Sequence, residues 1–237
     1  DRYQFPRLKT IISNAAPLSQ EAKEQMVGHF GNGILYECYG STEAGIVTNI
    51  SPKDILRKRD SVGLPFPYTE IAILDDNGVE VPSGEIGNVY SRSPYLFNGY
   101  WNKDKETEQV LRNGWVTAGD LGRVDNEGFL YIEGRAKDMI ISGGVNIYPK
   151  EVENVLLKFP GISEAVVVGV PDDYWGERVV AFLVCGFSEN RLPEVERYCK
   201  ERLSNFKIPK EYRIISEIPR NQTGKLLRRV LRERIGD

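Results

Sequence analysis

A short polar run, Tyr39-Gly40-Ser41-Thr42-Glu43, carries residue types that suit a nucleotide site. A glycine lets the backbone approach a phosphate closely, and a threonine hydroxyl can donate to a phosphate oxygen. A glutamate carboxylate can hold Mg²⁺ together with phosphate oxygens, and a tyrosine ring offers a face for adenine. The same run also fits a strand-to-loop turn with a capping threonine and a solvated glutamate.

Two later segments could add to such a site. Ala118-Gly119-Asp120 follows Trp115, and one aspartate carboxylate can accept hydrogen bonds from both hydroxyls of a ribose. Gly134-Arg135-Ala136-Lys137-Asp138 precedes the pair Gly143-Gly144. The planar fork of an arginine suits a ribose or a phosphate. Alternatively, the aspartate caps a turn, and the arginine belongs to a salt-bridged β-turn.

A lysine lies in a polar turn near the end of the chain, in Asn221-Gln222-Thr223-Gly224-Lys225-Leu226. Its ammonium could bridge a carboxylate and phosphate oxygens, where a transition state concentrates negative charge. It could equally be a solvated lysine at a helix N-terminus. It belongs to a basic stretch, most of which we expect on the exposed face of the last helix: Arg220, Lys225, Arg228, Arg229, Arg232 and Arg234.

In this order and at these spacings, the segments resemble the second half of an adenylate-forming enzyme, over essentially the whole chain. This superfamily includes acyl-CoA synthetases, and residues 142–153 resemble the CoA ligases more than peptide synthetase domains. The segment Ser13–Leu18 resembles the small-residue stretch that lines the adenine and acyl pockets, although members often have glycines at the positions of Asn14 and Ala15. The family's phosphate loop, ending in Pro-Lys-Gly, has no counterpart here, so we expect a truncated enzyme.

The resemblance implies a role for each matching residue. Nucleotide contacts fall to Asn14, Ala15, Tyr39 at adenine, Thr42 at the α-phosphate, Asp120 at ribose, Arg135 and Lys225. Catalysis would rest on Lys225, Thr42 and Glu43, with Glu43 as the Mg²⁺ ligand. Lys137 would be an interdomain hinge, and Gly143 and Gly144 would line the channel for CoA.

The implied reaction joins a fatty or aryl carboxylic acid to CoA with ATP and Mg²⁺, through an acyl-adenylate, in an acid-thiol ligase that releases AMP and pyrophosphate. We expect the isolated chain to be inactive. Two alternatives stay open: an adenylation domain that loads a carrier protein, and a non-catalytic fragment.

Composition excludes several other classes. A net charge of -3 gives no electrostatic case for nucleic acid, and no run of about 18 apolar residues exists. The chain has one histidine, His29, so a hydrolase with a histidine base is not expected. Its three cysteines, Cys38, Cys185 and Cys199, show no metal-ligand spacing. A cytoplasmic location fits this cysteine usage.

The elements that must position these residues follow from local patterns. Short apolar runs broken by Asp76-Asn77-Gly78 and Pro82-Ser83-Gly84 predict antiparallel strands, which we expect to form a small distorted β-barrel. The fold class is α/β and α+β, with residues 1–136 in a large domain and 137–237 in a small mixed lid domain. The expected helices and strands are the strands 8–13, 34–38, 165–170, 179–185 and 212–215, and the helices 19–30, 104–111, 149–159, 192–203 and 226–235.

Overall fold

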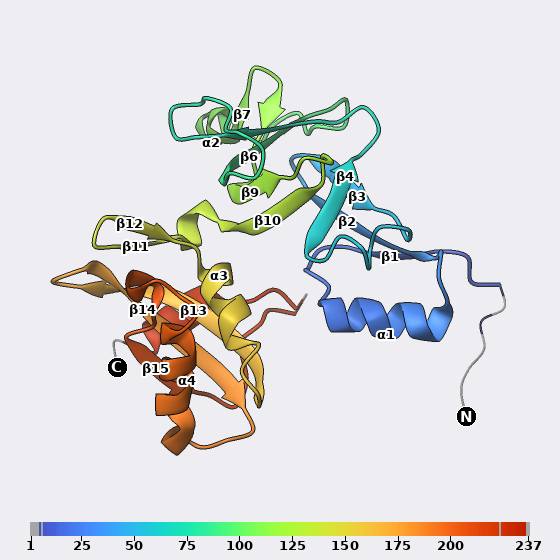
Figure 1. Cartoon of the computed structure of the whole chain (residues 1–237). Coiled ribbons are helices and arrows are strands. Elements are labelled where there is room, and N and C mark those ends of the chain that lie inside the picture. The colour runs from blue at the N-terminus through green and yellow to red at the C-terminus, as the bar shows by residue number, and fades with distance from the viewer. Residues whose placement is uncertain (1–4, 6, 223, 236–237) are drawn as a thin grey trace. The chain divides into compact units, whose positions relative to one another are not determined.

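The computed structural model describes residues 5, 7–222 and 224–235 (Figure 1). The chain divides into two compact units, Asp1–Glu133 and Gly134–Asp237, and each unit holds its own apolar clusters. Within the described ranges, no helix has the length and apolar character that crossing a membrane requires.

The first unit is built on a ten-stranded sheet with the strand order β1-β2-β3-β4-β10-β9-β6-β8-β7, in which β5 pairs with β6 outside this path. Strands β1 and β2 run parallel, and most of the remaining pairs are antiparallel. Its elements are β1 (Ile11–Ser13), α1 (Gln20–Phe30), β2 (Leu35–Ser41), β3 (Gly45–Ile50), β4 (Ser61–Pro65), β5 (Glu70–Leu74), β6 (Gly87–Arg92), α2 (Asp104–Val110), β7 (Leu111–Arg112), β8 (Trp115–Val116), β9 (Asp120–Val124) and β10 (Leu130–Arg135).

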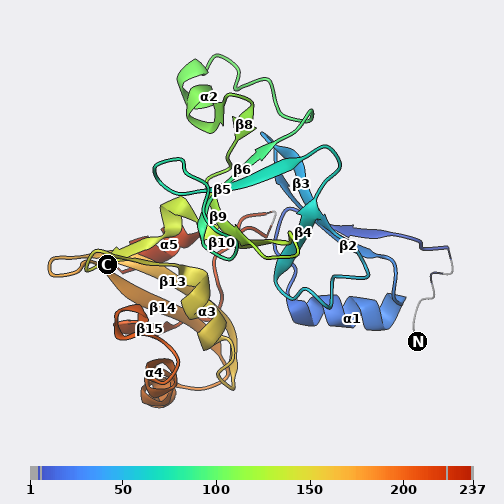
Figure 2. The ribbon, with the colours of Figure 1, turned by 45° about the horizontal axis from the view of Figure 1, so that its top comes forward.

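Helix α1 lies along the strands β1 and β2 (Figure 2). Its side chains Met26 and Val27 pack against a cluster around Leu35, Ile50 and Ile55. Ser19 caps the helix, because its hydroxyl accepts a hydrogen bond from the backbone N–H of Ala22 at 3.2 Å. The expected cap and helix are therefore confirmed.

The predicted mixed fold class is confirmed in this unit, with two differences. The strands over residues 61–92 are antiparallel as expected, but the described strands form an open sheet whose path ends at β1 and β7, and not a closed barrel. The first strand is shorter and less buried than expected, since it begins at Ile11 and the residue Ile12 is 62% exposed.

In the described part of the second unit, a five-stranded sheet is combined with three α-helices. Strand β14 pairs with β13 and β11 antiparallel and with β15 in parallel, and β12 completes the sheet beside β11. Its elements are η1 (Ala136–Asp138), β11 (Ile140–Ser142), β12 (Val145–Ile147), α3 (Pro149–Leu156), β13 (Ile162–Asp172), β14 (Gly176–Cys185), η2 (Glu189–Arg191), α4 (Leu192–Lys200), η3 (Asn205–Lys207), β15 (Glu211–Ile214) and α5 (Arg228–Glu233).

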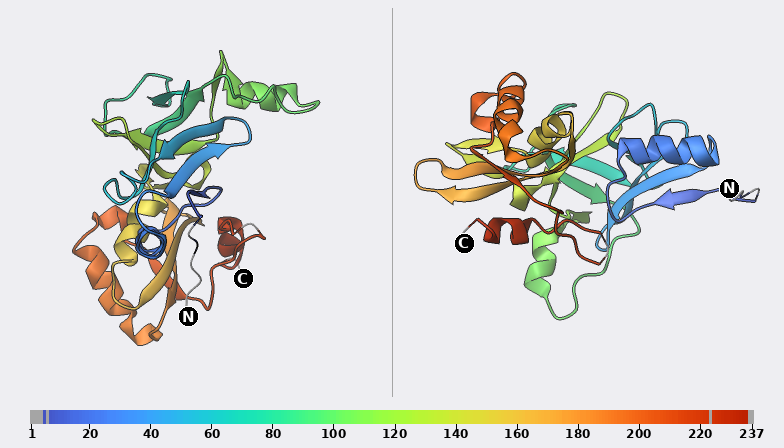
Figure 3. Two further views of the ribbon diagram at one scale, coloured as in Figure 1. Left: turned by 90° about the vertical axis from the view of Figure 1, so that its right-hand side faces the viewer. Right: turned by 90° about the horizontal axis from the view of Figure 1, so that it is seen from below.

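Both faces of the edge strand β13 are covered, which explains its unbroken apolar run Val166–Val170. Val167 faces a cluster that contains Val152 of α3 and Val195 of α4. Val166 and Val168 belong to a second cluster, which Leu231 of α5 completes. Helices α3 and α4 therefore lie on one face of the sheet and α5 on the other (Figure 3).

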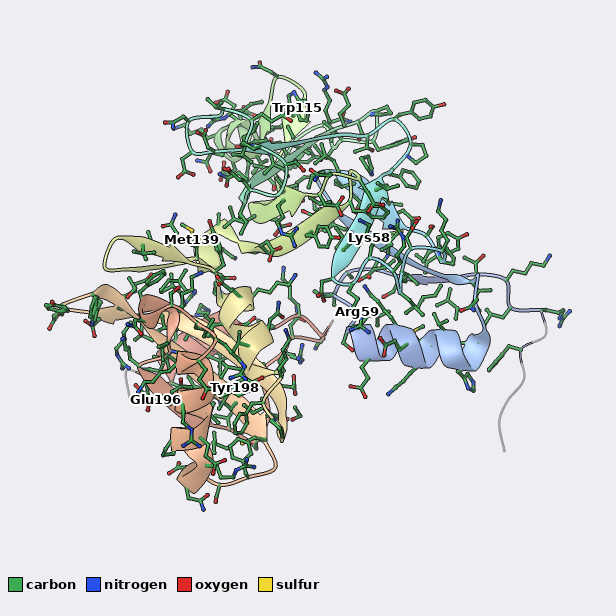
Figure 4. All side chains as sticks on the ribbon, in the orientation of Figure 1. Lys58, Arg59, Trp115, Met139, Glu196 and Tyr198 are labelled. Carbon is green, nitrogen blue, oxygen red and sulfur yellow. The ribbon has the colours of Figure 1, made fainter. Side chains whose placement is uncertain are left out.

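Helices α3 and α4 begin where the sequence indicates and end earlier than expected, whereas α5 also begins later than expected. Pro149 is the first residue of α3, as expected from its fixed φ. Helix α4 is identified in Figure 4 by its labelled residues Glu196 and Tyr198. Helix α5 does not include Leu226, because this residue forms an isolated β-bridge with Arg220. The hairpin of β11 and β12 was not expected from the sequence.

Candidate active site

Thr42 and Glu43 lie in the tight turn that joins β2 to β3, since Ser41 pairs with Gly45. The Ser41 hydroxyl accepts a hydrogen bond from the N–H of Ala44 at 3.1 Å, which closes the turn. Thr42 is exposed and Glu43 is half-buried. A side chain at Gly40 would place its Cβ 2.0 Å from the carbonyl oxygen of Gly45. Strand packing alone therefore requires a glycine at position 40, whether or not this residue also contacts a ligand.

Tyr39 and Asp120 meet although 81 residues separate them in the chain. The Tyr39 hydroxyl donates to Oδ2 of Asp120 at 2.7 Å. The tyrosine ring is half-buried against an apolar cluster that includes Val47 and Val116. Asp120 begins β9 and is buried. The structure thus brings together the residues expected at adenine and at ribose.

Sequence reasoning missed Tyr100, which holds the carboxylate of Glu43. The Tyr100 hydroxyl donates to Oε1 of Glu43 at 2.5 Å, and the backbone N–H of Phe97 donates to the Glu43 carbonyl at 2.9 Å. The hydrogen bond to the carboxylate and the burial of the ring both raise the pKa of Tyr100, so the hydroxyl stays protonated and keeps donating. No local pattern in Gly99-Tyr100-Trp101 distinguishes this tyrosine from the others.

Asn14 and Ala15 follow β1 and have exposed side chains. Ala15 has a φ of +69°, in the left-handed region that glycine adopts more readily. A glycine at this position would adopt the same conformation without strain. The place of Asn14 and Ala15 at the adenine pocket stays a prediction.

The remaining predicted residues belong to the second unit. Arg135 is half-buried at the end of β10, whose last two residues belong to the second unit, and Lys137 is exposed in the 3₁₀ turn η1. Gly143 and Gly144 form the two-residue turn between β11 and β12, with φ values of +58° and +79°. Two positive φ values in succession are typical of a type I′ hairpin turn, for which glycine is well suited.

Lys225 is exposed at the end of a small hairpin-like turn. The backbone N–H of Asn221 donates to the Lys225 carbonyl at 2.9 Å, and the N–H of Lys225 donates to Oδ1 of Asn221 at 2.8 Å. The bridge between Arg220 and Leu226 closes the base of the turn. Thr223 of the same motif lies outside the described residues.

The described residues contain no group of three or more histidine, cysteine, aspartate or glutamate side chains that could hold a metal ion. Glu43 thus offers one carboxylate, and Mg²⁺ is commonly bound by one or two carboxylates together with substrate phosphates and water. The donor set fits an ion that arrives with a nucleotide. It does not fit a metal held by protein ligands alone.

The mixed α/β architecture and the paired side chains of the first unit define the class of adenylate-forming enzymes. The AMP-binding enzyme family matches residues 1–101, and the family's C-terminal domain matches residues 151–225. The chain belongs to the AMP-binding enzyme family.

Two curated relatives are named as CoA ligases. The chain is 44% identical over 229 residues to the long-chain-fatty-acid–CoA ligase FadD13 of Mycobacterium tuberculosis, with 96% of this chain and 45% of that protein covered. It is 41% identical over 233 residues to a long-chain-fatty-acid–CoA ligase of Bacillus subtilis, with 98% of this chain and 41% of that protein covered. The chain therefore spans less than half the length of these relatives.

Solved structures agree with this relationship. ATP-bound MatB from Rhodopseudomonas palustris has a TM-score of 0.88 and 34% identity, covering 99% of this chain and 48% of that one. The o-succinylbenzoate CoA synthetase MenE from Bacillus subtilis, in complex with its acyl-adenylate intermediate, has a TM-score of 0.81 and 38% identity. That comparison covers 94% of this chain and 46% of MenE.

Proposed function

We propose that this chain supplies part of the nucleotide site and the lid of an ATP-dependent acyl-CoA synthetase. In the first step an oxygen of the substrate carboxylate attacks the α-phosphorus of ATP, the bond to the bridging oxygen breaks, and pyrophosphate leaves. In the second step the thiol sulfur of CoA attacks the acyl carbon of the acyl-adenylate. The thiol proton passes to solvent, the bond from the acyl carbon to the adenylate oxygen breaks, and AMP leaves.

The observation that carries this proposal is the contact between Tyr39 and Asp120 beside the turn that holds Glu43. The Asp120 carboxylate would accept hydrogen bonds from the ribose hydroxyls. The hydrogen bond that it also accepts from the Tyr39 hydroxyl fixes the position of the carboxylate. Tyr39 would offer its ring to adenine, with Asn14 and Ala15 at the edge of the same pocket. Thr42 would donate to the α-phosphate from the β2–β3 turn.

Glu43 would hold the Mg²⁺ ion that accompanies ATP, and Tyr100 would fix the orientation of the carboxylate. The ion, when bound, neutralises charge on the phosphate oxygens. The protein's own contribution is a carboxylate that is already oriented before the nucleotide arrives, so that little reorganisation is needed.

The second unit would provide the groups that change between the two steps. Lys225 would bridge the acyl carboxylate and the α-phosphate during adenylation, where its positive charge opposes the developing negative charge. Arg135 would contact ribose or phosphate. Lys137 would be the hinge of a domain rotation, and the turn Gly143-Gly144 would line the channel for the thiol arm of CoA.

The acid is proposed by class only, as a fatty or aryl carboxylic acid. Two relatives are long-chain-fatty-acid–CoA ligases, and MenE is an o-succinylbenzoate CoA synthetase. A carrier protein bearing phosphopantetheine is the alternative acceptor, because its thiol is chemically the same as that of CoA.

The test uses the full-length protein that contains this chain, with ATP, Mg²⁺ and a panel of fatty and aryl acids, with and without CoA. We expect AMP release that depends on CoA and an acyl-CoA product identified by mass. An acyl-adenylate that forms but never passes to CoA would reject the CoA ligase and favour the carrier protein. The isolated 237-residue chain is expected to show negligible turnover.

Lys225→Ala in the same protein tests the role of the lysine. We expect the rate of adenylation to fall by at least about 100-fold, which is in the range seen when one transition-state contact is lost. The exchange of pyrophosphate into ATP measures this rate. Formation of acyl-CoA from a supplied acyl-adenylate should change by less than about threefold, because pyrophosphate has already left before this step. Equal loss of both steps would contradict this role.

A further inference from the structure

Arg228 differs from the other basic residues of the last helix. It is the first residue of α5 and stands three positions after Lys225 in the sequence. Its side chain is 18% exposed, whereas that of the adjacent Arg229 is 82% exposed. Most of this basic stretch was expected on the exposed face of the last helix, so the burial of Arg228 requires a different explanation.

The Arg228 guanidinium joins α5 to α3 and to the edge strand β13. Its Nη1 donates to Oε1 of Glu153 at 2.7 Å and to the backbone carbonyl of Val167 at 2.6 Å. Nη2 donates to Oε2 of the same glutamate at 3.3 Å. Glu153 in turn accepts from the backbone N–H of Val167 at 2.8 Å. One guanidinium is thus fixed by two elements of the sheet-and-helix core.

The same arginine faces the segment of the predicted hinge. Its Nε lies 3.8 Å from Oδ2 of Asp138, and Nη2 of Arg232 donates to Oδ1 of Asp138 at 3.1 Å. Asp138 directly follows Lys137 in the turn η1. The four residues Asp138, Glu153, Arg228 and Arg232 form what we call the Arg228 cluster. All four belong to the second unit.

In the sequence, Lys225 lies between Arg228 of this cluster and Arg220, which also binds β13. On the other strand of its turn, Arg220 forms an ion pair with Glu164 of β13 and donates to the Gly224 carbonyl at 3.2 Å. After the turn, the backbone N–H of Leu227 donates to the Pro219 carbonyl at 2.9 Å. The backbone that carries Lys225 is therefore held to β13 on one side by Arg220 and on the other by Arg228.

We propose that Arg228 is a positioning residue that fixes the backbone of the Lys225 turn relative to Asp138, so that the lysine and the predicted hinge segment move as one rigid piece. This inference rests on the proposed role of Lys225 in adenylation. A displacement of about 1 Å at a catalytic group can cost about 100-fold in rate. A flexible turn would therefore reduce the stabilisation that the Lys225 ammonium gives to the transition state. The planar fork of arginine can bind a carboxylate and a carbonyl simultaneously, which the single ammonium of a lysine does less well.

Arg228→Gln in the full-length protein tests the inference, with Arg229→Gln as the matched control on the same helix. We expect Arg228→Gln to lower kcat for adenylation by at least about tenfold, with KM for ATP changed by less than about threefold. Formation of acyl-CoA from a supplied acyl-adenylate should stay within about twofold of the parent rate. Arg229→Gln should leave both half-reactions unchanged, because its side chain is exposed.

A double variant separates positioning from general structural damage. In a Lys225→Ala background, Arg228→Gln should cause no further loss of adenylation, because the residue acts through the lysine. A further loss in that background, or an equal fall of both half-reactions in Arg228→Gln alone, would overturn the proposal. If Arg228→Gln does not fold, Arg228→Lys, which keeps the positive charge, replaces it as the test variant. It should give a partial loss restricted to adenylation, and full adenylation activity in Arg228→Lys would also overturn the proposal.

The two proposals fail in different ways. If Lys225→Ala leaves adenylation intact, the proposed function of the lysine is wrong, whatever the arginine variants do. If Lys225→Ala abolishes adenylation while Arg228→Gln folds and adenylates normally, the proposed function stands and the positioning role of Arg228 is rejected.

Discussion

At the scale of the residue, the side chains of the candidate site are held by partners far away in the sequence. Tyr39 donates to Asp120 across 81 residues, and Tyr100 donates to Glu43 across 57. Hydrogen bonds to ionised groups are stronger than neutral ones, so such partners orient a carboxylate before any ligand binds. The same reasoning applies to Arg228, whose partners belong to α3 and β13.

A buried ion pair outside the site should have a larger effect on stability than any surface pair. Nζ of Lys23 lies 2.6 Å from Oε2 of Glu37, and the two side chains are 4% and 6% exposed. We expect Lys23→Met to lower the free energy of unfolding of the first unit by about 3–5 kcal/mol, because it leaves a buried carboxylate without its cation. Urea unfolding of the chain measures this change.

The double variant Lys23→Met/Glu37→Gln is the control for this prediction. It removes the charge together with its partner, while the glutamine can still accept from the backbone N–H of Leu18 as Glu37 does. We expect it to recover most of the lost stability. A single variant as stable as the parent would show that the carboxylate is not buried in solution.

At the scale of the element, turns decide which side chains the strands present. The β2–β3 turn presents Thr42 and Glu43, and the β11–β12 turn presents Gly143 and Gly144. In both turns glycine is required for packing or backbone conformation, independently of any ligand. The backbone around the candidate site is thus built by ordinary turn chemistry.

Alanine substitutions test the β11–β12 turn. Gly144 has a φ of +79°, and a Cβ added there would meet no atom within 4 Å, so Gly144→Ala should cost about 1–2 kcal/mol from backbone strain alone. Gly143→Ala should cost more, because its Cβ would also lie 3.1 Å from the Trp175 ring. Gly186→Ala, where neither problem exists, is the control and should lie within about 0.5 kcal/mol of the parent. Denaturant midpoints compare the three variants, and equal midpoints would contradict the expectation.

The link between Lys58 and the β9–β10 turn should make the first unit sensitive to acid. Lys58 donates to Asp125 at 2.7 Å and to Glu127 at 2.5 Å. The hydrogen bond from Lys58 lowers the pKa of Glu127 below its ordinary value of 4.5. For Asp125, burial opposes ionisation, but hydrogen bonds from Lys58 and the backbone outweigh it and lower the pKa below 3.8.

Because both carboxyl pKa values are lowered by folding, their contribution to stability is present above the ordinary values of 3.8 and 4.5 and is lost as the pH falls through the lower folded values. The pKa of Lys58 is raised above 10.5 by its hydrogen bonds to the two carboxylates, so its contribution is lost only as the pH rises beyond that value. We expect Lys58→Met to flatten the fall in Tm between about pH 5 and pH 3, the range in which these carboxyl groups titrate. Arg59→Met, at an exposed neighbour, should leave the slope unchanged. Parallel slopes for both variants would contradict the prediction.

At the scale of the whole molecule, the chain consists of two units with separate cores. The second unit has two apolar clusters of its own, one on each face of its sheet. About 100 residues with such a core are enough for independent folding. The hinge at Lys137 and the domain limits 1–136 and 137–237 stay predictions, which the following experiment addresses.

Residues 134–237 expressed alone should fold and unfold in one cooperative transition, because the clusters on both faces of their sheet are complete within this range. Circular dichroism against temperature measures the transition. Residues 151–237, which lack the strands β11 and β12, are the control and should be less stable, since Ile140 and Ile147 of the larger cluster are missing. If the fragment 134–237 shows no cooperative unfolding transition, then folding of the second unit depends on the first.

The sequence by itself determined the elements whose cause is local. Ser19 as a helix cap and Pro149 as a first helical residue both act within a few residues of their own position. The order of the motifs also determined the family, because each motif is a short stretch of chain. The strand that ends at Ser13 is present but is shorter and less buried than expected, and the described strands of the expected small distorted β-barrel form an open sheet. Burial and strand pairing depend on distant neighbours, which a local pattern does not contain.

Only the tertiary structure decided which side chains meet. Tyr100 and Arg228 have no local pattern that distinguishes them from other tyrosines and arginines of the chain, yet one holds Glu43 and the other holds Glu153. Their partners lie 57 and 75 residues away, and such contacts arise when strands and helices pack. The physical reason is that short-range conformational preference fixes an element, whereas long-range packing fixes the environment of each side chain in it.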